Sequence, residues 1–277
     1  MGDAIMKRIS FILAIVLLIF LLGVALLAPW LTLHDPYEQN LDNRFAKPSR
    51  TYWFGTDDLG RCIYSRIILG TRTSLFIGIV VVSLNTLIGT LVGLVSGFGP
   101  KVVDSIVMGF IDVLLALPGP ILTLAVAGIL GHGLLKMIIA LTFLGWVSYA
   151  RIVRGMVLSL KEREFVESAR TLGLGSFHIL FKHLLPNCLG PVIVLSSMEM
   201  GGIIMMVAGL SFLGLGLQDS YPEWGAMLDQ GKDYLRTAPH LAIFPGLAIM
   251  VTVLTFNLLG DGLRDLLQGE EATRLFK

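Results

Sequence analysis

Two acidic side chains, Glu199 and Asp112, lie inside long apolar stretches of the sequence, where an ionised carboxylate is costly. Insertion scales put that cost at about 2.5–3.5 kcal/mol at the centre of a membrane helix, so such a residue needs a partner or water. Each could line a polar path or a subunit interface, or be satisfied by a neighbouring helix. Asn257 joins them as a candidate for the path or interface, although Asn257 and Asn85 also fit simple hydrogen bonding between helices.

Residues with the chemistry of metal ligands show no ligand spacing. The histidines are scattered and form no pair at i, i+4, so the sequence predicts no metal site in this chain. The methionines crowded into residues 198–206 fit adaptable packing better than soft-metal ligation. Cys62 and Cys188 belong to no CxxC pair and are predicted to be unpaired packing residues. The five histidines are His34, His132, His178, His183 and His240.

Motifs for hydrolytic chemistry are missing as well. The sequence contains no H-E-x-x-H, no G-x-S-x-G and no G-x-x-x-x-G-K-S/T phosphate-binding loop. We therefore predict a non-enzymatic chain that cannot hydrolyse ATP alone. Lys+Arg (21) and Asp+Glu (20) nearly cancel, so no basic field indicates binding to nucleic acid.

The elements that must position these residues are apolar helices. The chain has 277 residues, of which 55% are hydrophobic and only 15% charged, against about a quarter charged in soluble domains. Apolar blocks of about 20 residues predict membrane spans. The first block follows Lys7 and Arg8 and is too long for a cleaved signal peptide, so we predict that it is retained. The six predicted spans cover residues 9–28, 74–98, 102–130, 134–157, 188–217 and 241–263.

Six crossings place both termini on one side of the membrane. Slightly more than half of the Lys and Arg residues then share the side of the amino terminus, which favours a cytoplasmic amino terminus. Polar connections of residues 30–72, 159–187 and 218–240 separate the spans. Pro118-Gly119-Pro120 interrupts the third span, which predicts either a broken helix near a path or an ordinary packing kink.

The 159–187 connection has the pattern of a short amphipathic helix, a glycine turn and a second helix. Gly173 suits the left-handed residue that closes the first helix, and the second runs from Phe177 to Leu185, before Pro186. Such a segment could lie on the lipid surface or dock in a cleft of another protein. The apolar stripe of the first helix contains Phe165, Val166, Ala169 and Leu172.

This loop resembles the E-A-A-x3-G-x9-I-x-L-P loop of bacterial ABC importer permeases. The matching residues are Glu167-Ser168-Ala169, Gly173 and His183-Leu-Leu185-Pro186. Further stretches resemble the C-type permeases of dipeptide, oligopeptide and nickel importers, and the resemblance covers the chain from about Trp53 onward. They are Trp53-Phe-Gly-Thr-Asp-Asp-Leu-Gly-Arg61, Ser65-Arg66, Ser211-Phe-Leu-Gly-Leu-Gly216, Glu223-Trp-Gly225 and Phe256-Asn-Leu-Leu-Gly-Asp-Gly-Leu-Arg-Asp265.

The resemblance implies an all-α integral membrane protein with the type I ABC importer permease fold. Residues 1–72 would form the first helix and an external loop, residues 73–268 the permease core with the coupling loop 159–187, and residues 269–277 a cytoplasmic tail. The resemblance assigns ATPase coupling to Glu164, Phe165, Val166, Glu167, Ser168, Ala169, Arg170, Gly173, His183 and Pro186.

The resemblance also implies partners and a location. The chain would sit in the bacterial inner membrane beside a second, homologous permease, with two ATPase subunits and an extracytoplasmic solute-binding protein. No cofactor is expected in this chain, because ATP and Mg would be bound by the ATPase subunits.

Three positions depart from the branch and bear on the cargo. Cys62 stands where the branch usually has Asp, Gly109 where Arg is common, and Val207 where peptide permeases usually carry Glu. Val207-Ala-Gly, with Glu199 eight residues earlier, is more similar to nickel permeases. We therefore predict nickel or a metal-chelate complex as cargo, with short peptides as the alternative.

Two other classes of protein fit the sequence less well. A secondary transporter needs internal repeats and mid-membrane ionisable residues, and only Glu199 meets the second condition. An intramembrane enzyme needs a catalytic motif, and none is present.

Overall fold

The computed structural model describes residues 2–217 and 221–275, and this part of the chain is helical, without β-strands. The long helices are α1 (Gly2–Leu31), α2 (Ile63–Phe98), α5 (Leu134–Leu160), α8 (Leu185–Phe212) and α10 (His240–Leu275). The shorter ones are α3 (Lys101–Leu115), α4 (Gly119–Leu130), α6 (Glu164–Thr171), α7 (Ser176–His178) and α9 (Trp224–Lys232), with a 3-10 turn at Leu41–Asn43 and a π turn at Ile179–Leu184.

Five of the six predicted spans correspond to single helices that are long and apolar enough to cross a membrane. The third does not, because α3 and α4 meet at an angle of 84°. Pro118 caps α4 and Pro120 lies in its first turn, where the missing N–H costs no helical hydrogen bond. Of the two alternatives for this block, the structure shows the broken helix.

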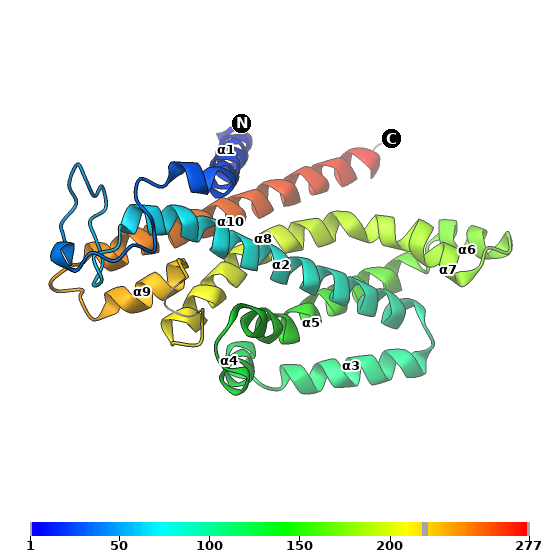
Figure 1. Cartoon of the computed structure of the whole chain (residues 1–277). Coiled ribbons are helices and arrows are strands. Elements are labelled where there is room, and N and C mark those ends of the chain that lie inside the picture. Colours follow the sequence, from blue (N-terminus) through cyan, green and yellow to red (C-terminus); the bar gives the residue numbers. More distant parts are fainter. Residues whose placement is uncertain (1, 218–220, 276–277) are drawn as a thin grey trace.

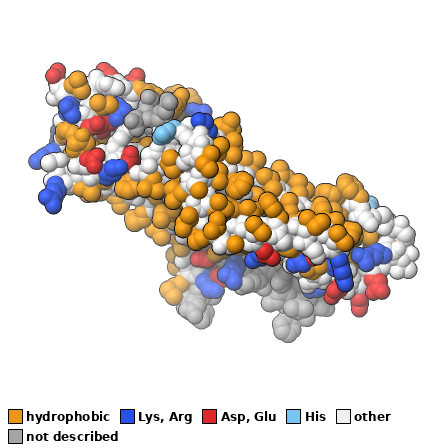
Figure 2. All heavy atoms as spheres, turned by 90° about the horizontal axis from the view of Figure 1, so that it is seen from below, with side chains coloured by type: hydrophobic (Ala, Val, Ile, Leu, Met, Phe, Trp, Pro, Cys, Tyr) orange, Lys and Arg blue, Asp and Glu red, His pale blue; other side chains and the backbone are white. Residues whose placement is uncertain are grey.

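The helices form an elongated body, with α6 and α7 at one end and α9 at the other (Figure 1). The helix α1 packs mainly against α10, and Lys7 of α1 lies 3.1 Å from Asp265 of α10. This contact places the beginning of α1 beside the end of α10. An even number of membrane crossings requires this arrangement, because both termini then lie on the same side. On the face shown in Figure 2, hydrophobic side chains cover the middle and charged ones gather mainly toward the two ends.

The most extensive contact between helices joins α2 and α5. Two glycines of α2 make this close contact possible. A Cβ atom on Gly89 would stand 2.4 Å from the carbonyl oxygen of Trp146, and one on Gly93 would stand 2.6 Å from that of Ala150. Such small residues let helices approach closely in a membrane. In α8, by contrast, Gly202 and Gly209 have no other atom within 4 Å of an added Cβ.

Two boundaries differ from those predicted. The helix α2 begins at Ile63 rather than near Ser74, so the first polar connection is shorter than expected. The predicted polar connection after α8 contains α9. Both differences arise because polar residues find buried partners in the folded chain. Cys62 and Cys188 are free and buried, as predicted.

Candidate coupling site

The helix α6 is fixed to the end of the membrane bundle by two small apolar residues. Val166 is 0% exposed and Ala169 is 4% exposed, and both belong to a core cluster with residues of α2, α5 and α8. The partners of this cluster are Leu94, Tyr149, Val153, Val157, Ile179, Leu184, Cys188 and Val192. The two side chains of α6 thus share one apolar core with residues of three long helices.

The glycine turn has the predicted conformation. Gly173 has a φ of +78°, the left-handed region that favours glycine. Its N–H donates to the carbonyl of Arg170 (2.9 Å), and the N–H of Leu174 donates to that of Ala169 (3.1 Å). These two bonds form the Schellman motif, which satisfies the last free carbonyls of a helix. The turn thus ends α6 sharply and redirects the chain.

Two cationic side chains bind the loop to the end of α2. The ammonium of Lys161 donates to the carbonyl of Gly97 (3.0 Å), and the guanidinium of Arg170 lies 5.6 Å from the ring centre of Phe98. Arg170 therefore serves this chain's own packing. Glu164, Glu167 and Ser168 are exposed on the opposite side of α6.

The predicted apolar stripe of α6 divides into two surfaces. Val166 and Ala169 face the bundle, whereas Leu172 is 79% exposed and Phe165 is 39% exposed. The four residues predicted to form one apolar stripe therefore do not share one surface, because α6 ends at Thr171 and Leu172 is exposed just beyond it. Phe177 is 75% exposed and contacts the ring of Phe181 at 4.4 Å between centres. We call Leu172, Phe177 and Phe181 the apolar knob.

The second half of the loop is not a separate helix. The segment Ser176–Phe212 is one continuous helical stretch, with the π turn Ile179–Leu184 inside it. The i, i+5 geometry of this turn brings the rings of His178 and His183 to 5.7 Å between centres. His183 is half-buried and Pro186 is exposed in the first turn of α8. Among the described residues, no group of three or more potential metal ligands is present.

The three candidate path residues lie on three different helices. Asp112 of α3 is exposed and forms an ion pair with Arg151 of α5 at 2.6 Å. Glu199 of α8 is half-buried, and Asn257 of α10 is exposed beside Gly201. No hydrogen bond or ion pair joins the three among the described interactions, so their assignment to a path stays a prediction.

Hydrogen bonding between helices was predicted for Asn85, and this prediction was wrong. Both polar atoms of the Asn85 side chain are buried without a hydrogen-bond partner, and the side chain packs against Gly145 of α5. The polar link between α2 and α8 is formed by the neighbouring Thr86, whose hydroxyl lies 2.8 Å from that of Ser196.

A buried charge cluster at the other end of the molecule escaped the sequence reasoning. The guanidinium of Arg61 donates to the Asp57 carboxylate at 2.6 Å, and that of Arg66 lies 3.6 Å from the same carboxylate. Both guanidinium groups also reach the side-chain oxygen of Gln230 on α9, at 3.2 and 3.4 Å. The signal that could have revealed this cluster is the position of its charges within the Trp53–Arg66 stretch. We used that stretch only to support the family resemblance.

Glu223 adds a second buried acid at that end. Its carboxylate accepts the backbone N–H groups of Gly225 (2.8 Å) and Ala226 (2.9 Å), so it caps α9. The hydroxyl of Ser74 on α2 donates to the same carboxylate (3.4 Å). Burial raises the pKa of Glu223 above its ordinary value, and these hydrogen bonds oppose the rise. The capping acid thereby connects α9 to α2.

The fold and the loop define a class: a multi-pass membrane protein with a helical loop docked on the end of its bundle. A family model described as binding-protein-dependent transport system inner membrane component matches residues 89–270. A second, described as the N-terminal TM domain of oligopeptide transport permease C, matches residues 5–48. The chain belongs to this family of ABC importer permeases, whose type I fold it shares.

Curated relatives are similar over most of their length. The glutathione transport system permease protein GsiD of Pectobacterium atrosepticum is 45% identical over 90% of this chain and 84% of its own length. The dipeptide transport system permease protein DppC of Alkalihalophilus pseudofirmus is 41% identical over 88% and 80%. The probable D,D-dipeptide transport system permease protein DdpC of Escherichia coli is 39% identical over 91% and 85%.

Family membership carries general consequences for this chain. Permeases of this family work with ATPase subunits and a binding protein in a membrane. The chain is thus a non-catalytic component of an ATP-driven importer. The relatives are named for glutathione and dipeptides, so they favour our alternative of short peptides and give no support to closeness with nickel permeases.

Proposed function

We propose that this chain is one of two homologous permease subunits of an importer for short peptides. The amino terminus lies in the cytoplasm of a bacterial cell and the chain spans the inner membrane. Two ATPase subunits bind ATP and Mg, and an extracytoplasmic binding protein delivers the peptide. The similarity to permeases named for glutathione and dipeptides supports this cargo over nickel.

The observation that carries the coupling role is the division of the α6 region into two surfaces. One surface buries Val166 and Ala169 in the bundle, and the other presents the apolar knob to a partner. Apolar side chains flanked by charges are suited to docking in a protein groove. Closure of the ATPases would move α6, and the bundle would rock between inward-open and outward-open states.

Coupling is tested by Gly173→Val and Glu167→Lys. The branched side chain at φ +78° strains the turn, and the reversed charge disturbs the exposed face of α6. We expect each variant to insert normally and to lose at least about tenfold in ATP-driven uptake, measured in proteoliposomes containing the complete importer. The matched control Gly155→Ala has open space around its Cβ and should transport normally. Normal uptake by both test variants would contradict the coupling role.

The cargo is tested separately with the partner binding protein. Glutathione and an unmodified dipeptide should raise its melting temperature, because a ligand that binds only the folded state stabilises it. A shift with Ni²⁺ alone would restore the nickel interpretation and contradict the peptide proposal.

A further inference from the structure

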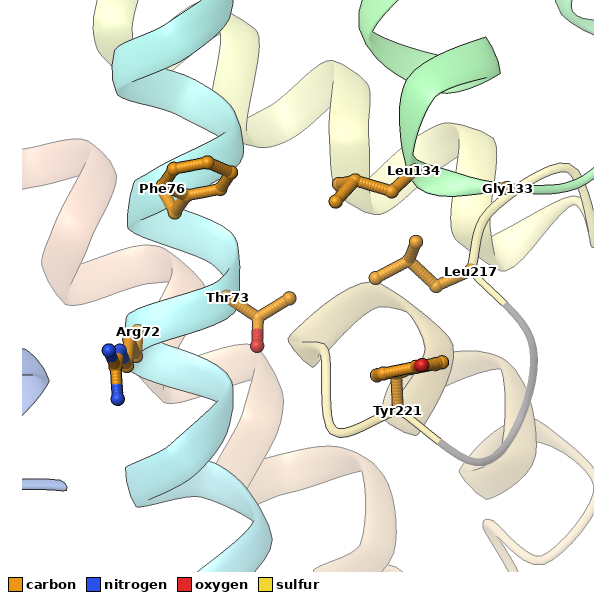
Figure 3. Close-up of a pocket in the computed structure, with 7 residues that line it drawn as sticks. All are labelled: Arg72, Thr73, Phe76, Gly133, Leu134, Leu217 and Tyr221. Carbon is orange, nitrogen blue, oxygen red and sulfur yellow. The ribbon is translucent and has the colours of Figure 1, made fainter. Parts of the chain in front are cut away.

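A cavity of about 590 Å³ lies at the end of the molecule opposite the coupling site. Three of the residues that line it come from α2, two from the start of α5 and its preceding turn, and two from the segment after α8 (Figure 3). They are Arg72, Thr73, Phe76, Gly133, Leu134, Leu217 and Tyr221. On the proposed orientation, this is the external side, where cargo arrives.

The walls of the cavity combine apolar side chains with a few polar groups. Phe76, Leu134 and Leu217 provide the apolar surface, and the hydroxyl-bearing side chains of Thr73 and Tyr221 border the same gap (Figure 3). Binding sites for small ligands typically have this composition and a volume of about 300–1,000 Å³. The cavity therefore has the size and lining for a small amphipathic molecule rather than a bare ion.

Arg72 provides the single formal charge among the described lining residues. It is exposed, lies one helical turn before Phe76 on α2, and forms no ion pair among the described interactions. In the view of Figure 3 its guanidinium lies at the rim of the gap, turned away from Leu134, Leu217 and Tyr221, so binding into the cavity requires this exposed side chain to change rotamer. A guanidinium binds a carboxylate through two parallel hydrogen bonds and repels a divalent cation. Its neighbour Arg66, by contrast, is buried beside Asp57 and is not available.

We propose that this cavity receives the peptide on its way into the membrane, with Arg72 binding the free C-terminal carboxylate. Phe76 and Leu134 then contact the peptide's side chains. This inference rests on the proposed peptide function and adds the recognised group and the residue that recognises it. Because short peptides of different sequence share the carboxylate, Arg72 can bind them while the apolar walls tolerate different side chains.

The test uses the complete importer in nanodiscs and alanyl-p-benzoylphenylalanine, a dipeptide with a free carboxylate and a photoreactive side chain. The binding protein delivers the probe, the sample is illuminated, and adducts are mapped by mass spectrometry. We expect adducts on Phe76 or Leu134 in the wild type and about tenfold fewer in Arg72→Gln. This is the reduction in binding expected when one hydrogen bond to a charged group is lost. Arg50→Gln removes another exposed arginine at this end and should leave the adducts unchanged.

A second variant keeps the test decisive if Arg72→Gln assembles poorly. Leu134→Trp narrows the cavity without changing charge and should also reduce the adducts several-fold. Wild-type complex that imports the probe without adducts in the cavity, or wild-type adduct levels in Arg72→Gln, would overturn the inference and leave the peptide function standing. A wild-type complex that does not import the dipeptide would overturn both.

Discussion

The two ends of this molecule hold their peripheral segments by opposite means. At the coupling end, α6 is attached through Val166 and Ala169, and its charges remain exposed. At the other end, Asp57, Arg61 and Arg66 are buried and paired. Small apolar contacts lose little when a helix shifts slightly, whereas buried ion pairs depend on exact geometry. From this difference we expect a movable attachment at the coupling end and a rigid brace at the other.

The largest effect is expected from removing one partner of the buried charge cluster. Asp57→Ala removes the carboxylate that lies between Arg61 and Arg66 and leaves Arg61 with the more distant carboxylate of Asp58 (3.7 Å), and breaking a buried pair costs about 3–5 kcal/mol. The thermal unfolding temperature of the purified permease should fall strongly. Asp42→Ala, an exposed acid in the same connection, is the control. An Asp57→Ala protein as stable as the control would contradict the conclusion that the buried charge cluster braces this end of the molecule.

A smaller, pH-dependent effect is expected at Glu223. Because burial raises the pKa of Glu223 in the folded chain, its stabilising contribution is present below the ordinary glutamate pKa and is lost as pH rises through the raised value. Glu223→Gln keeps a capping oxygen and cannot ionise. The stability of the wild type relative to Glu223→Gln should therefore decrease as pH rises above the ordinary glutamate range, measured by thermal unfolding. A difference independent of pH would contradict this account.

Much of the fold could be predicted from the sequence because its strongest signals are local. Five of the spans predicted from apolar blocks are single helices long enough to cross a membrane. Gly173 has the left-handed conformation that a helix end requires. The early start of α2 could not be predicted, because Ser65 and Arg66 look unsuited to a membrane helix until their partners are known. Their partners are the backbone N–H of His34 and the side chain of Gln230, both distant in sequence.

The candidate site was predicted in outline, and its two surfaces were not. Helical spacing groups Leu172 with Val166, but α6 ends one residue before Leu172 and the two side chains separate. The π turn likewise changes which residues are neighbours, so a search for histidines at i, i+4 misses His178 and His183. The ATPase-coupling roles that the resemblance assigns to residues of this loop stay predictions.

The central claim is that α6 and the turn after it have one surface for their own bundle and another for the ATPase, and one paired measurement tests it. Val166→Ser and Leu172→Ser introduce the same residue on the two surfaces, and both thermal unfolding and ATPase binding are measured in detergent. We predict that Val166→Ser loses about 1–3 kcal/mol of stability, whereas Leu172→Ser keeps its stability and binds the ATPase at least about tenfold more weakly. A Leu172→Ser permease that binds the ATPase as the wild type does would contradict the claim.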